Sequence, residues 1–489
     1  MPGRVGICEE ALRDAHQCLW STRMTNEMML PACSRIDAAG YDVVDLIGGA
    51  VWDVSVRFLK EDPWERIRHV SSLIKRTPLN AWVRGQSLWT FEIFPNDVVE
   101  LAMERLCANG IREIALYDQA NDLANIEVAA AKAKSVGIRI RGALVFTWSP
   151  VHTDPHYCAK AAEFVRLGAD EIIIKDPSGM LSAERAQSLV KSMRAAVGRT
   201  PINVHTHCMT GRAPEALIAA AKAGADKLHT AISPLAHGAS HPPTEWVHDE
   251  LAVHGIETGL DRRLLDEIAG YFRFVARRAG KPEGRPVKFD PFTLEHQMPG
   301  GMISNLVSQL RENRLEHLLE DILRESAAVR KDLGYAPVVS PTAQIMVTQA
   351  VLNVVQGERY KTILDELRKY VMGYYGRPAA PFHPELVERV ISLGGKPVTG
   401  RAGDFVPPAL ERLRRTRGPF KSDDDLLLAA MYSDAILQPM FEARSRADYT
   451  RCYHDFNPLK HLLEEVREQP GLRYFRMTKG PEVEVEVSH

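Results

Sequence analysis

The sequence predicts an α/β fold, a (β/α)8 TIM barrel followed by a mainly helical C-terminal domain. Over the first 235 residues, short β-branched or apolar runs alternate with longer Ala- and Leu-rich stretches of helical periodicity. Glycines stand at the ends of several predicted helices, where a left-handed residue can end a helix. This repeat of strand, helix and glycine is typical of a barrel of parallel strands, whose reactive groups lie at the C-terminal strand ends.

Eight segments are the predicted strands of this barrel. Four of them begin shortly after a glycine that can end the preceding helix, at Gly110, Gly137, Gly168 and Gly224. An open doubly wound sheet is the competing architecture, but the phosphate-binding pattern G-x-G-x-x-G does not follow an early strand. The predicted strands are 4–12, 42–47, 79–83, 112–117, 138–145, 171–175, 202–207 and 227–232.

The composition changes after residue 275. Residues 277–292 are rich in Arg, Lys, Pro and Gly, which is typical of a linker or crossover. Beyond them, 304–334 and 343–376 carry apolar residues at three- and four-residue spacing, as helices do. We therefore predict a barrel domain over 1–285 and a helical domain over 286–489 that completes the active-site funnel.

The overall composition excludes several classes of protein. Lys and Arg number 61 against 63 Asp and Glu, a net charge of −2, so no global field attracts nucleic acid or an anionic membrane. No apolar run approaches the ~20 residues that span a bilayer, and the N-terminus lacks the apolar core of a signal peptide. The seven cysteines include no C-x-x-C, which argues against a disulfide framework. We expect a cytoplasmic protein with no nucleic-acid partner.

His205 and His207 lie two residues apart in the predicted strand 202–207. Alternate residues of a strand face the same side, so both imidazoles can reach the barrel mouth. Imidazole is the commonest metal ligand, and the pair therefore predicts a metal site. The alternative interpretation is two hydrogen-bonded histidines of the core or the surface.

Asp14 and Lys175 are candidates to complete this site, because each lies near the end of a predicted strand. A protonated lysine has no free lone pair, but burial favours the neutral amine, which could react with CO2 to form a metal-binding carbamate. The alternative for Lys175 is a salt bridge to Asp14 or Asp176. Amidohydrolases use similar ligands with His-x-His on the first strand and the aspartate on the last, so hydrolysis is a minor alternative.

Further motifs are spread along the chain, and together they resemble one family. They are RDAHQ (13–17), GGA (48–50), RFLKEDPWERIR (57–68), RGQ (84–86), SPVHT (149–153), KDPSGML (175–181), NVHTHCMTG (203–211), HPPTE (241–245), QMPGGMISNL (297–306) and PTAQIMVTQAVLNV (341–354). From about residue 10 to residue 390, the chain resembles the carboxyltransferase component of biotin-dependent enzymes. The family includes pyruvate carboxylase, the oxaloacetate decarboxylase alpha subunit and the pyruvate-side transcarboxylase subunit.

The resemblance implies carboxyl transfer between carboxybiotin on a separate carrier and a 2-oxo acid, either pyruvate and oxaloacetate or a related compound, through a metal-stabilised enolate. It implies that Asp14, carbamylated Lys175, His205 and His207 hold a divalent ion, with zinc, manganese or cobalt as candidates. A Lewis-acid cation at the enolate oxygen can lower the barrier by several kcal/mol.

The resemblance also assigns the substrate pocket. Gln17 and Arg84 match pyruvate-binding positions, and an arginine fork suits a carboxylate, with a surface ion pair as the alternative role for Arg84. Phe91 replaces a family tyrosine, and Ala239 replaces the proton-relay threonine of pyruvate carboxylases, with Ser240 adjacent as a possible substitute. The predicted catalytic residues are Gln17, Arg84, Lys175 and Ser240, and the predicted substrate-binding residues are Gln17, Arg84, Phe91 and Ala239. A lost relay costs ~10²–10⁴ in rate, so another group or another acceptor acid is expected.

The sequence has neither an Ala-Met-Lys-Met biotinylation site nor an ATP-grasp region. We therefore expect a biotin carrier subunit and either biotin carboxylase or decarboxylase-complex subunits as partners, and the resemblance implies a homodimer within the larger complex. One rival function is a metal-dependent lyase or Claisen-type synthase of the hydroxymethylglutaryl-CoA lyase kind, which also pairs an early RD motif with a late His-x-His. The other is a catalytically weakened assembly subunit.

Overall fold

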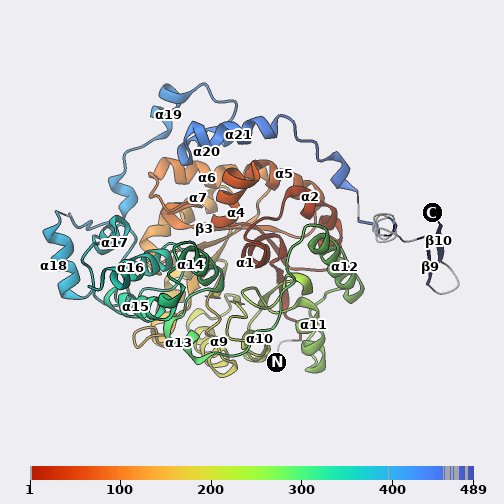
Figure 1. Ribbon diagram of the computed structural model, residues 1–489, viewed down its shortest axis with the longest axis horizontal. Coiled ribbons are helices and arrows are strands. Elements are labelled where there is room, and N and C mark those ends of the chain that lie inside the picture. The colour runs from red at the N-terminus through yellow and green to blue at the C-terminus, as the bar shows by residue number, and fades with distance from the viewer. Residues whose placement is uncertain are drawn as a thin grey trace.

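The protein forms a closed barrel of eight parallel strands (Figure 1). The strands pair in chain order, and the eighth pairs with the first to close the ring. The predicted fold class is confirmed. The computed structural model describes residues 3–394, 396–454, 456–457, 463, 466, 473–479 and 483–488. The barrel strands are β1 (Gly6–Glu9), β2 (Val43–Ile47), β3 (Leu79–Arg84), β4 (Glu113–Tyr117), β5 (Arg139–Val145), β6 (Glu171–Asp176), β7 (Ile202–Thr206) and β8 (Lys227–Thr230).

Each predicted strand segment overlaps one of these strands, and the first segment is the one most shortened. The segment 4–12 is strand only over Gly6–Glu9, after which the chain turns into the π-helix η1 (Ala11–Ala15). Single π-helical turns are rare and occur frequently at functional sites. This turn carries Asp14 at the C-terminal end of the barrel, beyond β1 rather than at the end of the strand itself.

Helices surround the barrel, and glycines end several of them as predicted. Gly110, Gly137, Gly168 and Gly224 all have positive φ, between 81° and 115°. An L side chain is strained in this conformation, so glycine lets the chain turn from the helix into the next strand. The helices of this part are α1 (His16–Leu19), α2 (Asn26–Met29), α3 (Cys33–Ala38), α4 (Gly49–Val54), α5 (Pro63–Leu73), α6 (Asn96–Asn109), α7 (Glu127–Ser135), α8 (Asp154–Arg166), α9 (Ala183–Val197), α10 (Ala213–Lys222), α11 (Thr244–Val253) and α12 (Arg262–Arg278).

The helices after residue 290 form two groups. The first has its own apolar core, built from residues between Met298 and Val390. One residue of this region, Val339, instead belongs to an apolar cluster with residues of the barrel strands, Trp82 and Tyr117 among them. The helices of this group are α13 (Pro291–His296), α14 (Gly300–Glu312), α15 (Leu319–Asp332), α16 (Thr342–Gln356), α17 (Asp365–Val371) and α18 (Pro384–Ser392).

The second group packs back on the barrel side. Leu427, Leu428 and Met440 belong to the same apolar cluster as the barrel core. Figure 1 shows this blue group along the edge that α5 and α6 form. Its helices are α19 (Leu410–Arg417), α20 (Asp423–Met431) and α21 (Asp434–Arg444). The domain boundary at residue 285 stays a prediction.

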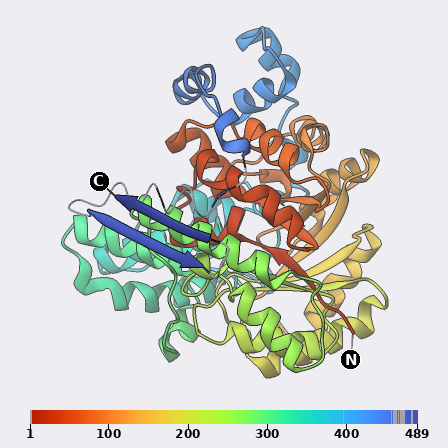
Figure 2. The same cartoon turned by 90° about the vertical axis from the view of Figure 1, so that its right-hand side faces the viewer.

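Two strands close to the C-terminus, β9 (Tyr474–Lys479) and β10 (Val483–Ser488), pair antiparallel with each other. Figure 2 shows them as a separate blue pair. Among the residues described, no helix has both the length and the apolar character needed to cross a membrane.

Candidate metal and substrate site

Three of the predicted metal ligands meet at the C-terminal end of the barrel. Asp14 follows β1, His205 lies in β7 and His207 directly follows β7. The Asp14 Oδ2 atom lies 3.3 Å from His205 Nε2 and 3.2 Å from His207 Nε2. All three side chains are buried. The structure therefore places them where TIM-barrel enzymes carry their active sites.

A fourth member of this cluster is His241, the first residue of the motif HPPTE, for which the sequence predicted no role. His241 lies between β8 and α11, and its Nε2 atom is 3.2 Å from Asp14 Oδ2. Its ring centroid is 4.5 Å from that of His205 and 4.3 Å from that of His207. A signal was available, because a histidine shortly after the eighth strand must lie on the same barrel face. We call Asp14, His205, His207 and His241 the four-residue cluster.

Each histidine of the cluster is oriented through its other ring nitrogen. The Nδ1 atoms of His205, His207 and His241 face Glu10 Oε1, the Ala239 carbonyl and the Thr206 carbonyl at 3.1, 2.7 and 3.1 Å, respectively. A carbonyl oxygen only accepts hydrogen bonds, so in His207 and His241 the Nδ1 atom carries the hydrogen and Nε2 keeps a free lone pair. Burial lowers the pKa of His205 well below its ordinary value and that of His241 to about 3, which keeps both rings neutral.

The donor set of the cluster fits a divalent cation. Burial opposes ionisation of Asp14, but Arg13, whose guanidinium lies 3.0 Å away, and the nearby imidazoles outweigh it and hold the pKa of Asp14 well below its usual range. A carboxylate oxygen and the lone pairs of neutral imidazoles repel one another when they converge without a proton between them. A cation bound among them removes this repulsion. The four residues could therefore hold one ion.

A second buried group of side chains, around Glu10 and His229, contacts the four-residue cluster through His205. Glu10 Oε1 accepts hydrogen bonds from His205 Nδ1 and from His229 Nδ1, the latter at 2.7 Å. Arg141, fully buried in the barrel and 3.3 Å from Glu171, donates to His229 Nε2 at 3.1 Å. Glu10, His205 and His229 are close enough to share an ion, but the Arg141 charge opposes a cation at His229.

Lys175 lies beside the four-residue cluster, on β6. Its Nζ atom is 3.4 Å from His205 Nε2 and 4.3 Å from the centroid of the Trp82 ring. Burial lowers the pKa of Lys175, which favours the neutral amine that can react with CO2. The carboxylates suggested as alternative salt-bridge partners are engaged elsewhere, Asp14 with Arg13 and Asp176 with the backbone N–H groups of 180 and 181.

Arg84 ends β3 and is buried, which does not fit the alternative role of a surface ion pair. Its Nε atom donates to Tyr117 Oη at 3.2 Å, and Nη1 donates to the Thr90 carbonyl at 2.5 Å. Gly49 lies against the remaining Nη2, where a Cβ atom would come within 3.0 Å. The Arg84 guanidinium and the Lys175 Nζ atom both lie 5.9 Å from the Tyr117 ring centroid, so Tyr117 lies beside both the arginine and the metal side of the pocket.

The other predicted pocket residues lie around these groups. Gln17 is half-buried in α1, three residues after Asp14. Phe91 is 48% exposed, and its ring lies 5.4 Å from the Arg84 guanidinium. Ser240 is fully buried, and its hydroxyl has no hydrogen-bond partner among the described residues.

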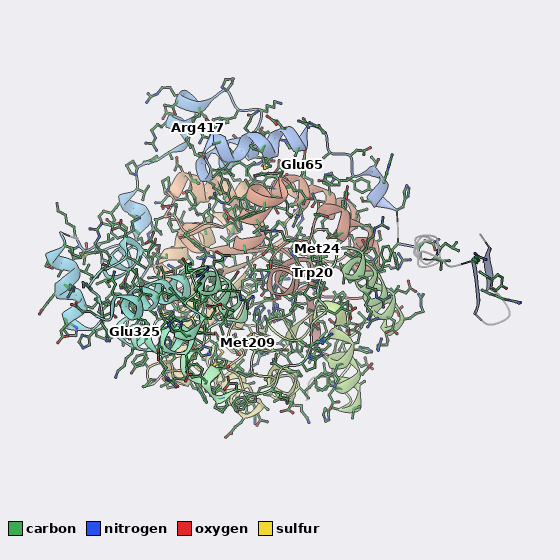
Figure 3. All side chains as sticks on the ribbon, in the orientation of Figure 1. Trp20, Met24, Glu65, Met209, Glu325 and Arg417 are labelled. Carbon is green, nitrogen blue, oxygen red and sulfur yellow. The ribbon has the colours of Figure 1, made fainter. Side chains whose placement is uncertain are left out.

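Ala239 contributes its carbonyl to His207, while its side chain packs against Gly300 of α14. A Cβ atom at position 300 would lie 2.9 Å from Ala239 Cβ and would overlap the sulfur of Met209. Figure 3 labels Met209 between α14 and α10. The helical part of the chain thus closes over Ala239.

Comparison with known proteins identifies the family. A model described as HMGL-like matches residues 4–271, the barrel, and a model described as a conserved carboxylase domain matches residues 293–488. The chain is 43% identical to a pyruvate carboxylase subunit of Methanocaldococcus jannaschii over 433 residues, 88% of this chain and 76% of that protein. The chain belongs to the family of biotin-dependent carboxyltransferase subunits. The predicted family is confirmed.

Other members of this family are similar over nearly the whole chain. The methylmalonyl-CoA carboxyltransferase 5S subunit of Propionibacterium freudenreichii is 37% identical over 93% of this chain and 90% of its own length. The 2-oxoglutarate carboxylase large subunit of Hydrogenobacter thermophilus is 36% identical over 96% of this chain and 72% of its own length. The carboxyl transferase domain of Rhizobium etli pyruvate carboxylase, solved with oxamate and biotin, superposes with a TM-score of 0.85 and 25% identity over 92% of this chain and 80% of that chain.

These relatives decide between the functions that the sequence left open. The HMGL-like model covers the barrel alone, but the carboxylase-domain match and the carboxyltransferase relatives extend through the helical part. The lyase and assembly-subunit alternatives are therefore not favoured. This chain is a biotin-dependent carboxyltransferase.

Proposed function

We propose that this carboxyltransferase moves a carboxyl group between carboxybiotin on a separate carrier and a 2-oxo acid, either pyruvate and oxaloacetate or a close relative. In the carboxylation direction, the acid loses a proton from its methyl carbon, CO2 leaves N1 of carboxybiotin and bonds to that carbon, and N1 receives a proton. The observation that supports this most is the buried four-residue cluster beside Lys175, with Arg84 held nearby through Tyr117.

A divalent ion is proposed to bind at the cluster, with zinc, manganese or cobalt as candidates. Its proposed ligands are Asp14, carbamylated Lys175, His205 and His207. Imidazole and carboxylate donors suit all three metals. Bound there, the ion supplies Lewis-acid stabilisation of negative charge on the substrate's keto oxygen. The proposal is supported by the short separations within the cluster and by the buried, lowered-pKa lysine amine beside it.

Arg84 is proposed to bind the substrate carboxylate, with Gln17 as a second polar contact. The Arg84 guanidinium has one terminal nitrogen, Nη2, left on the side of Gly49, where no side chain blocks it. Its other nitrogens are held by Tyr117 and the Thr90 carbonyl, so the group is oriented before the substrate arrives. Phe91 covers the guanidinium without offering a hydroxyl.

Ser240 is proposed to hold the proton that the family threonine would carry. It is buried and adjacent to Ala239, and its hydroxyl is not engaged by another described residue. A hydroxyl group can both donate and accept, which a relay needs.

The partners are proposed to be a biotin carrier subunit together with either a biotin carboxylase or the subunits of a decarboxylase complex, around a homodimer of this chain. The proposal is supported by the names of the relatives, each of which is called a subunit of its enzyme. The test is affinity purification of the full chain followed by a streptavidin blot and mass spectrometry. A co-purifying biotinylated chain with an ATP-dependent subunit supports a carboxylase, and biotin found on this chain itself contradicts the separate carrier.

The substrate is tested by transfer of labelled carboxyl groups from a carboxylated biotin carrier to a panel of 2-oxo acids. We expect a 2-oxo acid of three to five carbons to accept the label, as the activities for which the relatives are named suggest. Transfer to acyl-CoA but to no 2-oxo acid would overturn the proposed substrate class.

A further inference from the structure

We infer that His241 is a direct ligand of the divalent ion, so that Asp14 and three imidazoles hold the ion even when Lys175 carries no carbamate. This inference rests on the proposed function, because it concerns the same site. It adds a residue to the ligand set and makes the lysine carbamate an addition to a site that is already complete with four donors.

The separations of the donor atoms carry the inference. Asp14 Oδ2 lies 3.2, 3.2 and 3.3 Å from the Nε2 atoms of His241, His207 and His205. In a tetrahedral site with bonds of about 2.0–2.1 Å, neighbouring donors stand roughly 3.3 Å apart. His241 meets this condition as well as the two histidines of the His-x-His pair do. The four donor atoms also lie within 4.8 Å of one another.

The hydrogen bond of His241 separates a ligand from a residue that merely supports Asp14. Its Nδ1 atom faces the Thr206 carbonyl at 3.1 Å. If Nε2 carried the hydrogen and donated to Asp14, an unprotonated Nδ1 would face a carbonyl oxygen, and two acceptors would repel. The opposite tautomer satisfies Thr206 and points the Nε2 lone pair at the place that Asp14 shares with the other imidazoles. His207 is arranged in the same way on the Ala239 carbonyl.

Burial removes the other partners that His241 could have. The side chain is fully buried, and its ring packs against those of both His205 and His207. A buried lone pair without a donor is costly. A cation at the centre of the four-residue cluster satisfies it together with the other three donors.

Lys175 is placed differently from His241. Its Nζ atom is 3.4 Å from one donor, His205 Nε2, and otherwise lies over the Trp82 ring. A carbamate there would approach the ion from one side as a fifth ligand, and zinc sites do expand from four to five ligands.

The test uses the full chain stripped of metal and reloaded with Co²⁺, without any substrate. We measure three quantities: the metal content after dialysis, the Co²⁺ affinity and the visible ligand-field spectrum. The proteins compared are the parent chain, His241→Gln, Lys175→Ala and the surface control His254→Gln. We expect His241→Gln to bind Co²⁺ at least ~100-fold more weakly, which exceeds the usual effect of a supporting residue, and to change the spectrum. Lys175→Ala, in CO2-free buffer, should keep one ion per chain, and His254→Gln should match the parent.

A second variant protects the test against misfolding. In His241→Cys, a thiolate bonded to Co²⁺ would give a sulfur-to-metal charge-transfer band, which a thiol outside the ligand shell cannot give. Appearance of the band supports the inference. Absence of the band from a folded, Co²⁺-loaded variant overturns the inference. An unchanged affinity and spectrum in His241→Gln, or loss of the ion in Lys175→Ala, also overturns it. So does a parent chain that binds no Co²⁺. Because no substrate is present, loss of carboxyl transfer with the band intact would instead refute the proposed function alone.

Discussion

At the scale of single residues, the oxygen that faces each Nδ1 atom decides what each imidazole can do. The Ala239 carbonyl holds His207 at 2.7 Å, so position 239 acts through its backbone whatever side chain it carries. The contact that orients His207 therefore does not depend on the side chain at position 239. This separates the question of metal binding from the question of which acid is carboxylated.

Restoring the hydroxyl at this position is expected to raise turnover. Ala239→Thr should increase the rate of pyruvate carboxylation by roughly 10-fold, a fraction of what proton transfer by a positioned group contributes. Gly300 lies close to the Ala239 side chain, where a Cβ atom at position 300 would come within 2.9 Å, so the threonine must fit beside the backbone of α14. Ala239→Val is the matched control, because it has the same shape without the hydroxyl. Equal rates for the threonine and valine variants would contradict a relay at this position.

Replacing the oriented arginine is expected to weaken use of the 2-oxo acid. Arg84→Gln should lower kcat/KM by roughly 10²-fold, because loss of charge-assisted hydrogen bonds to a carboxylate costs about 3 kcal/mol. Steady-state kinetics with varied oxo acid measure this, and Arg263→Gln on the surface should leave kcat/KM unchanged. A parent-like kcat/KM in Arg84→Gln would remove Arg84 from the substrate site.

At the scale of elements, buried carboxylates connect helices to the turns beside them. Asp37 of α3 accepts hydrogen bonds from the backbone N–H groups of 75, 76 and 77, the turn that leads into β3. Asp424 of α20 accepts from Arg68, Arg105 and Asn109, which attaches the last helices to α5 and α6. These contacts fix the elements whose ends carry the site.

The Asp37 contact predicts a pH-dependent stability. Partial burial opposes ionisation, but the N–H groups of Thr77, Lys75 and Arg76 outweigh it and lower the pKa of Asp37. A carboxyl group with a lowered pKa in the folded state stabilises the protein above the unfolded-state pKa of about 4, and this stabilisation is lost as the pH falls through the folded-state pKa.

Removing this charge should therefore cost stability at neutral pH and flatten the acid response. Asp37→Asn is expected to lower the free energy of unfolding by about 1–3 kcal/mol at pH 7, with a smaller difference from the parent below pH ~4. Urea unfolding at several pH values measures both quantities. The exposed Asp266→Asn serves as the control, and a difference from the parent that is the same at all pH values would contradict the prediction.

At the scale of the whole molecule, the helices after residue 290 serve the barrel in two ways. The first group adds Val339 to an apolar cluster of barrel-strand residues and places Gly300 against Ala239, so it packs on the barrel beside the site. The second group returns to the barrel side and joins its apolar core. The site is therefore made by residues from both halves of the chain.

Chelation is expected to lower the stability of the whole molecule. An ion that binds only the folded state adds about 4 kcal/mol when its concentration is 1,000 times its Kd. We expect EDTA to lower the Tm of the parent chain by several degrees in calorimetry. The variant His205→Ala should have this lowered Tm both with and without EDTA. The surface variant His254→Gln should keep the parent's response, and a parent Tm that EDTA does not change would argue against a structural contribution from the ion.

Much of this protein could be predicted from local sequence. Patterns within a few residues predict the strand segments, the glycines that end helices, and the alternation that brings His205 and His207 to one side. Short-range backbone sterics enforce these features. The family motifs could be read because each is contiguous. Asp14 could be assigned to the correct end of the barrel, although it lies in a π-helical turn that no local pattern indicates.

Tertiary structure alone decided the partners of these residues. His241 reaches Asp14 across 227 positions of sequence, as Arg444 reaches Asp62 from α21. Such contacts depend on how the barrel closes and how the later helices pack on it, and neither is encoded within a short window. The sequence determined which side chains are available at the barrel mouth, and the closed ring decided which of their atoms meet, because long-range packing sets distances that local patterns do not.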